Sequence, residues 1–439
     1  MITAADMAVA PRPQAMRRLP AAAPLYAPAA ASAATPLRER LLLVMLYVTV
    51  LASSAVFIEP SPHDALMGVL AVACVAAGVH FDARILPMFL FLLIWNVSGL
   101  MSLINVVGEQ KTVQYSATSI YLAVAALMWA CLCLDNTMTR LATIRSAYIL
   151  TAVLVALAGI IGYFDLIPGT RALFAPDERA LGAFKDPNVF GPFLIWPALV
   201  ILQRMLTRRV GLIDLVTVGV LMLGLLLSFS RGAWFHFALS CLVMIALSLL
   251  TVQTRSGRLR IVVLSALTVG AIAVFVAILL TLPAVETMFQ ERAHIFQSYD
   301  VGQSGRFRLQ ELALSALLNA PNGLGPFGFA STHANQQHNQ YLQAFLVYGW
   351  VGGVAYILLL LTTFWVALRS VFVPTPWQPY LVITLAAFTG EVAEGFIVDT
   401  DHWRYFYLLV GLIWGLWAVT ARYRRPLYAP QPAYPVGAY

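Results

Sequence analysis

The stretch QQHNQYLQAFLVYGWVGG, residues 336 to 353, sets five amide side chains and a histidine directly against a long apolar run. That run extends to about residue 366, and about 20 apolar residues are enough for a helix to cross a hydrocarbon core roughly 30 Å thick. The stretch therefore predicts a transmembrane helix that carries a concentrated polar cluster at its threshold.

The same apolar pattern recurs along almost the whole chain. Of the 439 residues, 60% are hydrophobic and only 11% are charged, whereas roughly a quarter are charged in an ordinary soluble domain. These features predict an all-α polytopic membrane protein with about twelve transmembrane helices. The expected spans are 41–58, 65–80, 85–106, 112–134, 146–164, 189–206, 210–229, 232–251, 261–283, 341–366, 378–397 and 405–421.

The distribution of basic residues predicts the orientation. With the N-terminus in the cytoplasm, 18 of the 27 Lys and Arg residues fall on the cytoplasmic side, as the positive-inside bias requires. Residues 1–40, rich in Ala and Pro, are expected to form a disordered cytoplasmic tail. The transmembrane domain then covers 41–421, and 422–439 form a second cytoplasmic tail. The net charge of +7 is mostly this topology signal and calls for no nucleic-acid partner.

Neither a metal site nor a disulfide framework is expected. All four cysteines lie inside apolar spans, where they are typical of core packing. The histidines outside the opening stretch lack the spaced carboxylate or cysteine partners of a metal centre. We therefore expect no metal and no cofactor.

Two segments on the outer side are longer than the other connections. One runs from Asp165 to Asn188, and the other covers 284–338, ahead of the tenth expected span. Within the second, leucines at near-helical spacing predict a short amphipathic helix along the membrane surface. These leucines are Leu309, Leu312, Leu314, Leu317 and Leu318.

The topology leaves nine basic residues outside, against the usual bias. Arg231 in SFSRGAW and Arg306 in SGRFRL are the sharpest cases. Each has an ordinary interpretation, because arginines snorkel to headgroups or stay solvated in loops. Together, outer arginines facing lipid headgroups also suit the oxygens of phosphate, since the guanidinium fork offers paired donors. A lipid-linked pyrophosphate is the obvious candidate ligand.

The segment GAFKDPNVFGP, residues 182–192, adds Lys185, Asp186 and Asn188 just before an expected span. Asp, Pro and Asn are common where helices begin, so capping and substrate contact are both open. Lys185 and Arg308 are weaker candidates for phosphate binding than Arg231 and Arg306.

His338 is the leading candidate for catalysis. An unperturbed imidazole, with a pKa of about 6.5, accepts a proton near neutral pH. The amides around it, among them Asn339 and Gln340, offer both donors and acceptors for sugar hydroxyls. A lone histidine at a helix end is more often a simple interfacial residue, and the neighbouring amides favour the catalytic interpretation.

The stretch from His338 onward resembles the signature of the superfamily of O-antigen ligases and polysaccharide polymerases. That signature is a His followed by Asn, Ser or Gln, nine variable positions, a Gly, and a small residue three further on. His338, Asn339, Gly349 and Gly352 satisfy it without a gap. The expected spans, the large loop before the His, the SRG after span seven, and Arg306 followed by APNGLG are also similar to that superfamily.

The resemblance implies a GT-C-like, metal-independent glycosyltransferase in the bacterial inner membrane, active on the periplasmic side. Its donor would be a glycan on undecaprenyl pyrophosphate, and its acceptor a sugar hydroxyl of lipid A-core in lipopolysaccharide biosynthesis. His338 would be the general base of an inverting transfer, with Arg231 and Arg306 stabilising the leaving pyrophosphate. Lys185, Asp186, Asn188, Arg308, Asn339, Gln340 and Glu391 are expected to bind substrate.

Glu391 and Glu394, three residues apart in an expected span, need partners or a polar cavity because membrane-buried carboxylates are costly. An ion pair to Arg404 is slightly favoured over direct substrate contact by Glu391. The segment VDTDHWR, 398–404, is interpreted as a polar loop.

Two other functions stay open. A polymerase of the same superfamily would extend the lipid-linked glycan itself, but a large loop lying late and just before His338 favours a ligase. A flippase or other transporter would need basic residues deep within the spans, whereas here they lie at loops.

Overall fold

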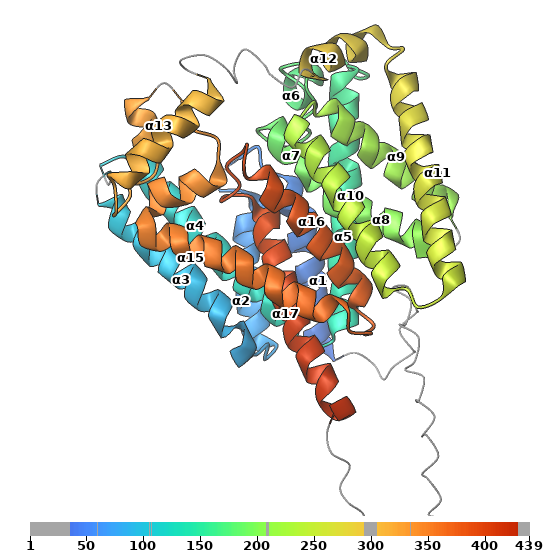
Figure 1. Ribbon diagram of the computed structural model, residues 1–439, viewed down its shortest axis with the longest axis horizontal. Coiled ribbons are helices and arrows are strands. Elements are labelled where there is room, and N and C mark those ends of the chain that lie inside the picture. The colour runs from blue at the N-terminus through green and yellow to red at the C-terminus, as the bar shows by residue number, and fades with distance from the viewer. Residues whose placement is uncertain are drawn as a thin grey trace, which may run out of the picture.

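The computed structural model describes residues 36–58, 60–104, 106, 108–207, 210–293, 305–333 and 335–428, and these residues contain helices but no strand. Figure 1 shows their arrangement. The helices are α1 (Leu37–Leu51), α2 (Pro62–Ala76), α3 (Leu86–Leu103), α4 (Gln110–Leu132), α5 (Thr137–Tyr163), α6 (Arg171–Phe174), α7 (Pro187–Phe193), α8 (Ile195–Thr207), α9 (Leu212–Leu227), α10 (Arg231–Thr251), α11 (Arg255–Leu279), α12 (Pro283–Ala293), α13 (Arg306–Leu318), α14 (Gly328–Thr332), α15 (Gln340–Val371), α16 (Gln378–Glu394) and α17 (Arg404–Tyr428).

Each expected apolar run overlaps a helix, and the chain is an all-helical polytopic membrane protein. In the described part of the chain, eight helical segments are long and apolar enough to cross a membrane. They are Ala83–Leu103, α4, α5, Pro187–Thr207, α10, α11, α15 and the first 20 residues of α17. The count of twelve spans and the GT-C-like architecture remain predictions.

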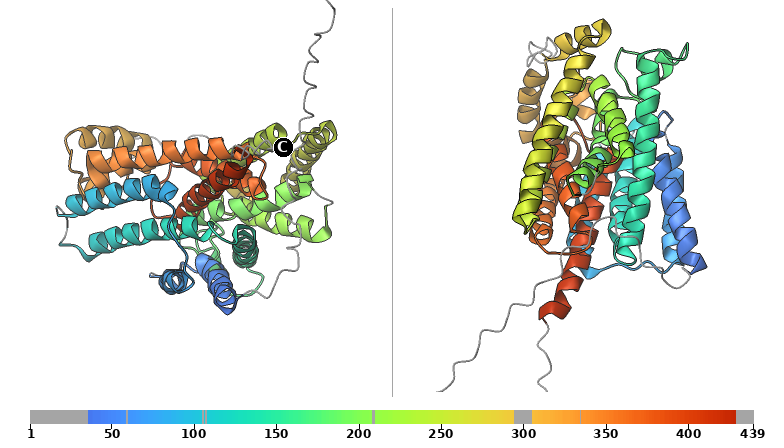
Figure 2. Two further views of the ribbon diagram at one scale, coloured as in Figure 1. Left: turned by 90° about the horizontal axis from the view of Figure 1, so that it is seen from below. Right: turned by 90° about the vertical axis from the view of Figure 1, so that its right-hand side faces the viewer.

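The start of α1 and the end of α17 lie at the same end of the bundle. In Figure 1, α1 begins and α17 ends at the bottom, whereas α6, α12 and α13 lie at the top, and the right-hand view of Figure 2 agrees. Helix α1 begins at Leu37, and α17 continues to Tyr428. Residues 1–35 and 429–439 of the predicted tails, and 294–304 of the predicted loop, lie outside the described residues.

Helices α16 and α17 occupy the interior of the bundle, and α11 lies at its edge. Helix α16 packs on α10, and α17 packs on α4 and α15. Of the membrane-crossing window of α17, 83% is buried, compared with 6% for α11. The last loops before and after α16 are therefore held by surrounding helices rather than by lipid.

The helix α15 bends at Gly349. This residue has φ +70° and ψ −179°, outside the helical region, in a conformation that L side chains rarely adopt. The loop after α13 docks at this bend, where the Trp350 amide donates to the carbonyl of Pro321 (2.9 Å) and the Leu324 amide to that of Leu346 (2.6 Å). Gly349, one of the two glycines of the signature, therefore joins α15 to the 320–325 loop.

The predicted amphipathic helix within the outer segment is confirmed as α13, but its leucines divide between two environments. Leu309, Ala313 and Leu317 are buried and pack with Leu346 of α15. Leu314 and Leu318 are exposed. The buried stripe therefore uses an alanine that the leucine pattern did not include.

We predict that Gly349→Ala destabilises the protein by more than about 2 kcal/mol, because a side chain there adds backbone strain. Its Cβ would also lie 2.8 Å from the carbonyl oxygen of Pro321. The midpoint of thermal unfolding in detergent is the measurement. The control is Gly219→Ala in α9, where a Cβ meets nothing within 4 Å. Equal midpoints for the two variants would contradict the prediction.

Candidate active site

His338 lies immediately before α15 and faces outward. The side chain of Asn339 caps this helix by accepting from the amides of Tyr341 (3.0 Å) and Leu342 (3.1 Å). His338 itself has φ +47°, a left-handed conformation uncommon for a residue other than glycine. Its side chain is 48% exposed. The cap therefore fixes the backbone at a histidine whose imidazole is open to the outer end of the bundle.

Three elements meet His338 at the C-terminal end of α16. The backbone amide of Gln340 donates to the carbonyl of Gly395 (2.7 Å), and the side-chain amide of Asn339 donates to the carbonyl of Phe396 (3.1 Å). From α13, the side-chain amide of Gln310 donates to the carbonyls of Phe396 (3.3 Å) and His338 (3.4 Å). These contacts join the first turn of α15, the end of α16 and α13.

The segment 398–404, interpreted from sequence as a polar loop, supplies the acidic partner of His338. Asp399 Oδ2 lies 3.5 Å from Nδ1 of His338. Burial raises the pKa of the Asp399 carboxyl, and its contact with His338 offsets part of that rise. Sequence reasoning missed Asp399, although two acids and a histidine within four outer residues were an available signal.

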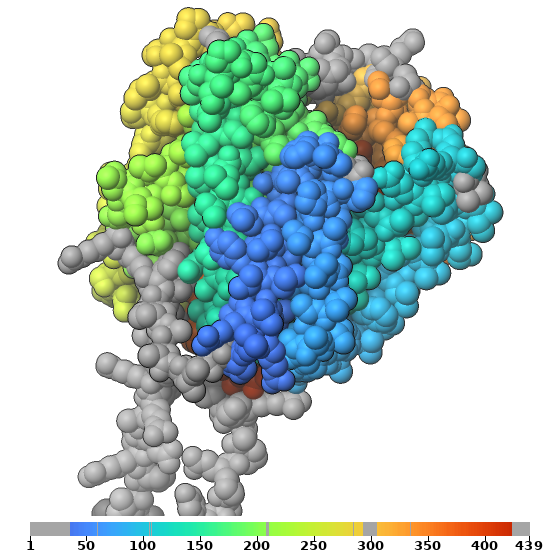
Figure 3. All heavy atoms as spheres, turned by 180° about the vertical axis from the view of Figure 1, so that it is seen from behind, coloured from blue at the N-terminus to red at the C-terminus, as the bar shows by residue number. Residues whose placement is uncertain are grey.

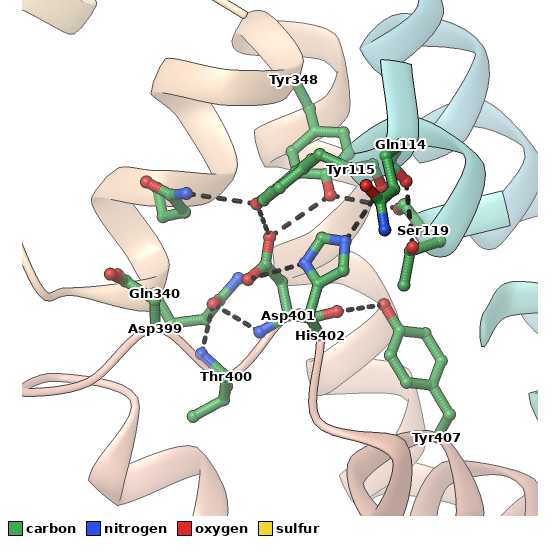
Figure 4. A network of polar contacts seen from close by, with 12 residues as sticks. Gln114, Tyr115, Ser119, Gln340, Tyr348, Asp399, Thr400, Asp401, His402 and Tyr407 are labelled. Carbon is green, nitrogen blue, oxygen red and sulfur yellow. Dashed lines mark hydrogen bonds and ion pairs between the residues drawn. The ribbon is translucent and has the colours of Figure 1, made fainter. Parts of the chain in front are cut away.

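Asp401, two residues further on, is buried at the centre of a polar network (Figure 4). It accepts hydrogen bonds from the hydroxyls of Tyr115 in α4 and Tyr348 in α15. Nδ1 of His402 lies 3.4 Å from Asp401 Oδ1. The network ties the loop after α16 to two neighbouring helices.

Gln340 connects this loop to the start of α15. Its side-chain oxygen accepts from the amides of both Thr400 (2.7 Å) and Asp401 (2.8 Å), and the side chain is fully buried. Nearby, the side-chain amide of Gln337 donates to the side-chain oxygen of Gln343 (2.5 Å). The side-chain amide of Gln343 in turn donates to the Tyr115 hydroxyl (3.2 Å). Part of the amide cluster predicted to bind sugar thus holds the protein's own loop.

Arg231 begins α10 at the same end of α16. A Cβ on its neighbour Gly232 would lie 2.6 Å from Oε1 of Glu394, so the backbones of α10 and α16 approach closely here. One turn into α10, Nδ1 of His236 lies 2.8 Å from Oε2 of Glu394. The start of α10, with Arg231, and the start of α15, preceded by His338, therefore both lie at one helix end.

The expected ion pair between Arg404 and the glutamates is wrong. Arg404 forms a two-pronged pair with Asp64 of α2, at 2.8 Å for each nitrogen. Glu394 bonds to His236 instead, and both carboxylate oxygens of Glu391 are buried without a hydrogen-bond partner. No local pattern indicated that α2, more than 300 residues away, would supply the partner of Arg404.

Arg306 opens α13 and is partly buried, four residues before Gln310, which bonds to His338. Arg308 is exposed and pairs with Glu311 (2.6 Å) on the same helix. Of these two arginines, Arg306 is the more buried and lies one helical turn from Gln310, whereas Arg308 is exposed and paired with Glu311.

The 182–192 segment forms the entry to α7, which packs on α10. Asp186 caps α7 by accepting from the Asn188 amide (2.7 Å), which confirms the capping interpretation. The Asn188 side chain accepts from Arg179 (3.0 Å), and Lys185 is exposed. Asp186 also lies near enough to Glu394 to interact with it electrostatically.

The candidate residues from four separate segments thus gather at one end of the molecule. Seen from behind, the surface at this end is hollowed between the green helices and orange α13, with later residues at its base (Figure 3). No group of three His, Cys, Asp or Glu side chains converges within the described ranges. The arrangement offers an exposed imidazole beside a carboxylate, with arginines on adjoining helices.

The stretch that carries His338, Arg231 and Arg306 is also the one that resembles known proteins. A family model described as O-antigen ligase matches residues 216–357. Over these residues the chain is similar to O-antigen ligases, in agreement with the resemblance of the motif at His338. The matched part of the chain runs from within α9 into α15, and it ends before Glu391 and Asp399. No curated protein matches the chain.

The stability of the 399–402 loop depends on pH through Asp401 and His402. Burial would lower the pKa of His402, but the Asp401 carboxylate outweighs burial and raises it. Burial would raise the pKa of Asp401, but His402 and the tyrosine hydroxyls outweigh burial and lower it. The pair is therefore fully effective between about pH 3.9 and 6.5, the unfolded values of the two groups. Its contribution is lost as pH rises through the folded pKa of His402, or falls through that of Asp401.

We predict that His402→Gln lowers the thermal unfolding midpoint more at about pH 6 than at about pH 9, because the charged imidazole is lost only at the lower pH. Glutamine retains a donor for the carbonyl of Tyr115. The control is His80→Gln, in a His–Asp pair whose side chains are 48% and 44% exposed. An equal loss at both pH values would contradict a charged His402.

Proposed function

We propose that this protein transfers a glycan from undecaprenyl pyrophosphate to a sugar hydroxyl of lipid A-core, as an O-antigen ligase of a bacterial inner membrane. The observation that carries the proposal is the placement of His338 within the matched region. An exposed imidazole at the start of α15 shares one helix end with Arg231 of α10 and with α13, which begins at Arg306. The site opens at the end of the bundle opposite both chain termini, which is the periplasmic side in the predicted orientation.

His338 is the general base in this proposal. It removes the proton from the acceptor hydroxyl as that oxygen attacks the anomeric carbon of the donor. The new glycosidic bond forms on the face opposite the pyrophosphate, and the bond from the anomeric carbon to the pyrophosphate oxygen breaks with its electron pair. The configuration at this carbon is inverted, and the proton stays on His338 until water removes it.

Arg231 and Arg306 stabilise the negative charge that grows on the departing pyrophosphate. Both are the first residues of their helices, so the backbone amides and dipole of each N-terminus favour an anion at the same place. Fixed cations aimed at developing charge are among the largest contributions to catalysis. Lys185 is exposed at the entry to α7 and adds a further positive charge.

The residues around His338 divide between scaffold and substrate contacts. Asn339 and Gln340 are engaged with the protein through their own side chains, so we assign them to positioning the site. Asn335 and Gln336 are more accessible and are the amides available to sugar hydroxyls. Glu391, buried beside Glu394, contributes to the electrostatic environment behind Arg231.

The decisive experiment mixes purified protein, undecaprenyl-pyrophosphate glycan and rough lipopolysaccharide, and follows the glycan onto lipid A-core by gel shift. We predict that His338→Ala reduces transfer by at least 100-fold, within the range that general bases contribute. Undiminished transfer by this variant would refute the general-base role. Growth of the glycan on its own lipid carrier would identify a polymerase. If neither product forms although the substrates are active, a transporter is favoured.

For Arg231, we predict that Arg231→Ala lowers kcat by about 100-fold or more, as expected when one charge-stabilising group is removed. Arg231→Lys should recover only part of the rate, because a lysine lacks the two-pronged donor geometry. Arg258→Ala at the opposite end of the bundle is the control and should leave kcat unchanged. A loss confined to KM would mean that Arg231 binds donor without stabilising the transition state.

A further inference from the structure

The side-chain environment of His338 differs from that of the other paired histidines. Within the described ranges, acids lie within 4 Å of His80, His236, His338 and His402. The His236 pair is buried, the His402 side chain is 23% exposed, and the His80 pair lies between the loops that precede α3 and α5. His338 is the member of this set that is open at the outer end while its acid, Asp399, is only 20% exposed.

We propose that Asp399 is a positioning residue for His338: its carboxylate accepts the Nδ1 proton and leaves Nε2 free to take the proton of the acceptor hydroxyl. Nδ1 is the ring nitrogen that faces Asp399, at 3.5 Å. Nε2 is the other ring nitrogen, and the His338 side chain is 48% exposed. This inference rests on the proposed function, because it specifies how the same base is oriented.

A carboxylate at this position serves two purposes. It selects the tautomer whose Nε2 carries the lone pair, because the other nitrogen must be a donor. It also stabilises the imidazolium that forms once the hydroxyl proton has been taken up. The contact of 3.5 Å is longer than a formed hydrogen bond, and such catalytic contacts shorten when substrate binds.

Asp399 is held in place from three directions. The backbone amide of Asn339 interacts with the Asp399 carboxylate. The backbone amides of Thr400 and Asp401, the next two residues, donate to the side-chain oxygen of Gln340. Asp401 is fixed in turn by Tyr115 and Tyr348 (Figure 4). The network therefore fixes the backbone on which Asp399 stands, while Asn339 also fixes the helix on which His338 stands.

Other titratable and charged groups surround the His338–Asp399 pair, and the effect of pH on this pair must be separated from its effect on those groups. Asp401 and His402 follow in the same loop, Glu391 and Glu394 lie in α16, Tyr341 lies in α15, and Arg306, Arg308 and Glu311 lie in α13. Of the carboxylates, Asp399 is the one in contact with the His338 ring. Its removal should therefore change the protonation of His338 more than any other single substitution.

The test is Asp399→Asn, which keeps the shape and removes the charge. We expect kcat to fall by about 100-fold or more, with little change in KM for the lipid-linked donor. The acidic limb of the pH–rate profile should move to lower pH, because His338 loses the anion that favours its protonated form. Asp135→Asn is the matched control, since it removes the acid of the exposed His80–Asp135 pair (3.2 Å).

A second readout does not depend on enzyme activity. Acylation of His338 by diethyl pyrocarbonate, followed by mass spectrometry across pH, reports the fraction of unprotonated imidazole. In Asp399→Asn the half-point should move to lower pH, whereas Asp135→Asn should leave it unchanged. The shift tests the pairing even if the assigned transfer reaction is wrong. If His338→Ala is inactive but Asp399→Asn behaves like the wild-type protein in both measurements, only the pairing is rejected.

Folding is checked by the thermal midpoint of each variant. If Asp399→Asn unfolds, Asp399→Ser, with a smaller neutral side chain, replaces it in both measurements with the same expected results. Wild-type kcat together with an unchanged half-point of acylation, in whichever variant is folded, overturns the proposal.

Discussion

The carbonyls of Gly395 and Phe396, directly after the C-terminal end of α16, are the constraint on which the candidate site depends. The last carbonyls of α16 accept from the amides that follow the helix and from the Tyr341 hydroxyl, so the next carbonyls need donors from elsewhere, and near a membrane each unmet group is costly. Here the amide of Gln340 and the side chain of Asn339 bond to the carbonyls of Gly395 and Phe396, and Gln310 adds a third donor. Satisfying the end of α16 therefore brings the start of α15, with His338, to a fixed place.

The same helix end organises the arginine side of the site. Gly232 allows α10 to approach Glu394, which in turn bonds to His236, so the N-terminus of α10 is also set against the end of α16. His338, the proposed base, and Arg231 are thus positioned relative to a single element. Such an arrangement limits relative movement, which favours charge stabilisation without reorganisation at the moment of reaction.

The spacing of the signature residues also has a structural explanation in this chain. His338 and Asn339 begin α15, and Gly349, about three turns later, bends it where the loop after α13 docks. That loop continues from the helix that begins at Arg306. One motif therefore sets both the start of α15, next to the proposed base His338, and the attachment of the segment that carries Arg306.

The sequence by itself determined the all-helical membrane fold and the approximate positions of the apolar helices, and it suggested the candidates His338, Arg231 and Arg306. It could do so because apolar runs and helix-start chemistry are local properties, and because the motif lies within one continuous stretch. It also predicted α13, but placed Leu314 and Leu318 on a stripe that in fact includes Ala313.

Only the tertiary structure decided which polar groups meet. Asp399 lies beside His338 across 61 positions of sequence, Arg404 pairs with Asp64 across 340, and Gln340 holds a loop rather than facing outward. Each of these contacts depends on how α16 and α17 pack against α2, α4 and α15. Polar side chains choose partners by distance in the folded bundle, where unmet hydrogen bonds are expensive, and that distance is not written in local composition.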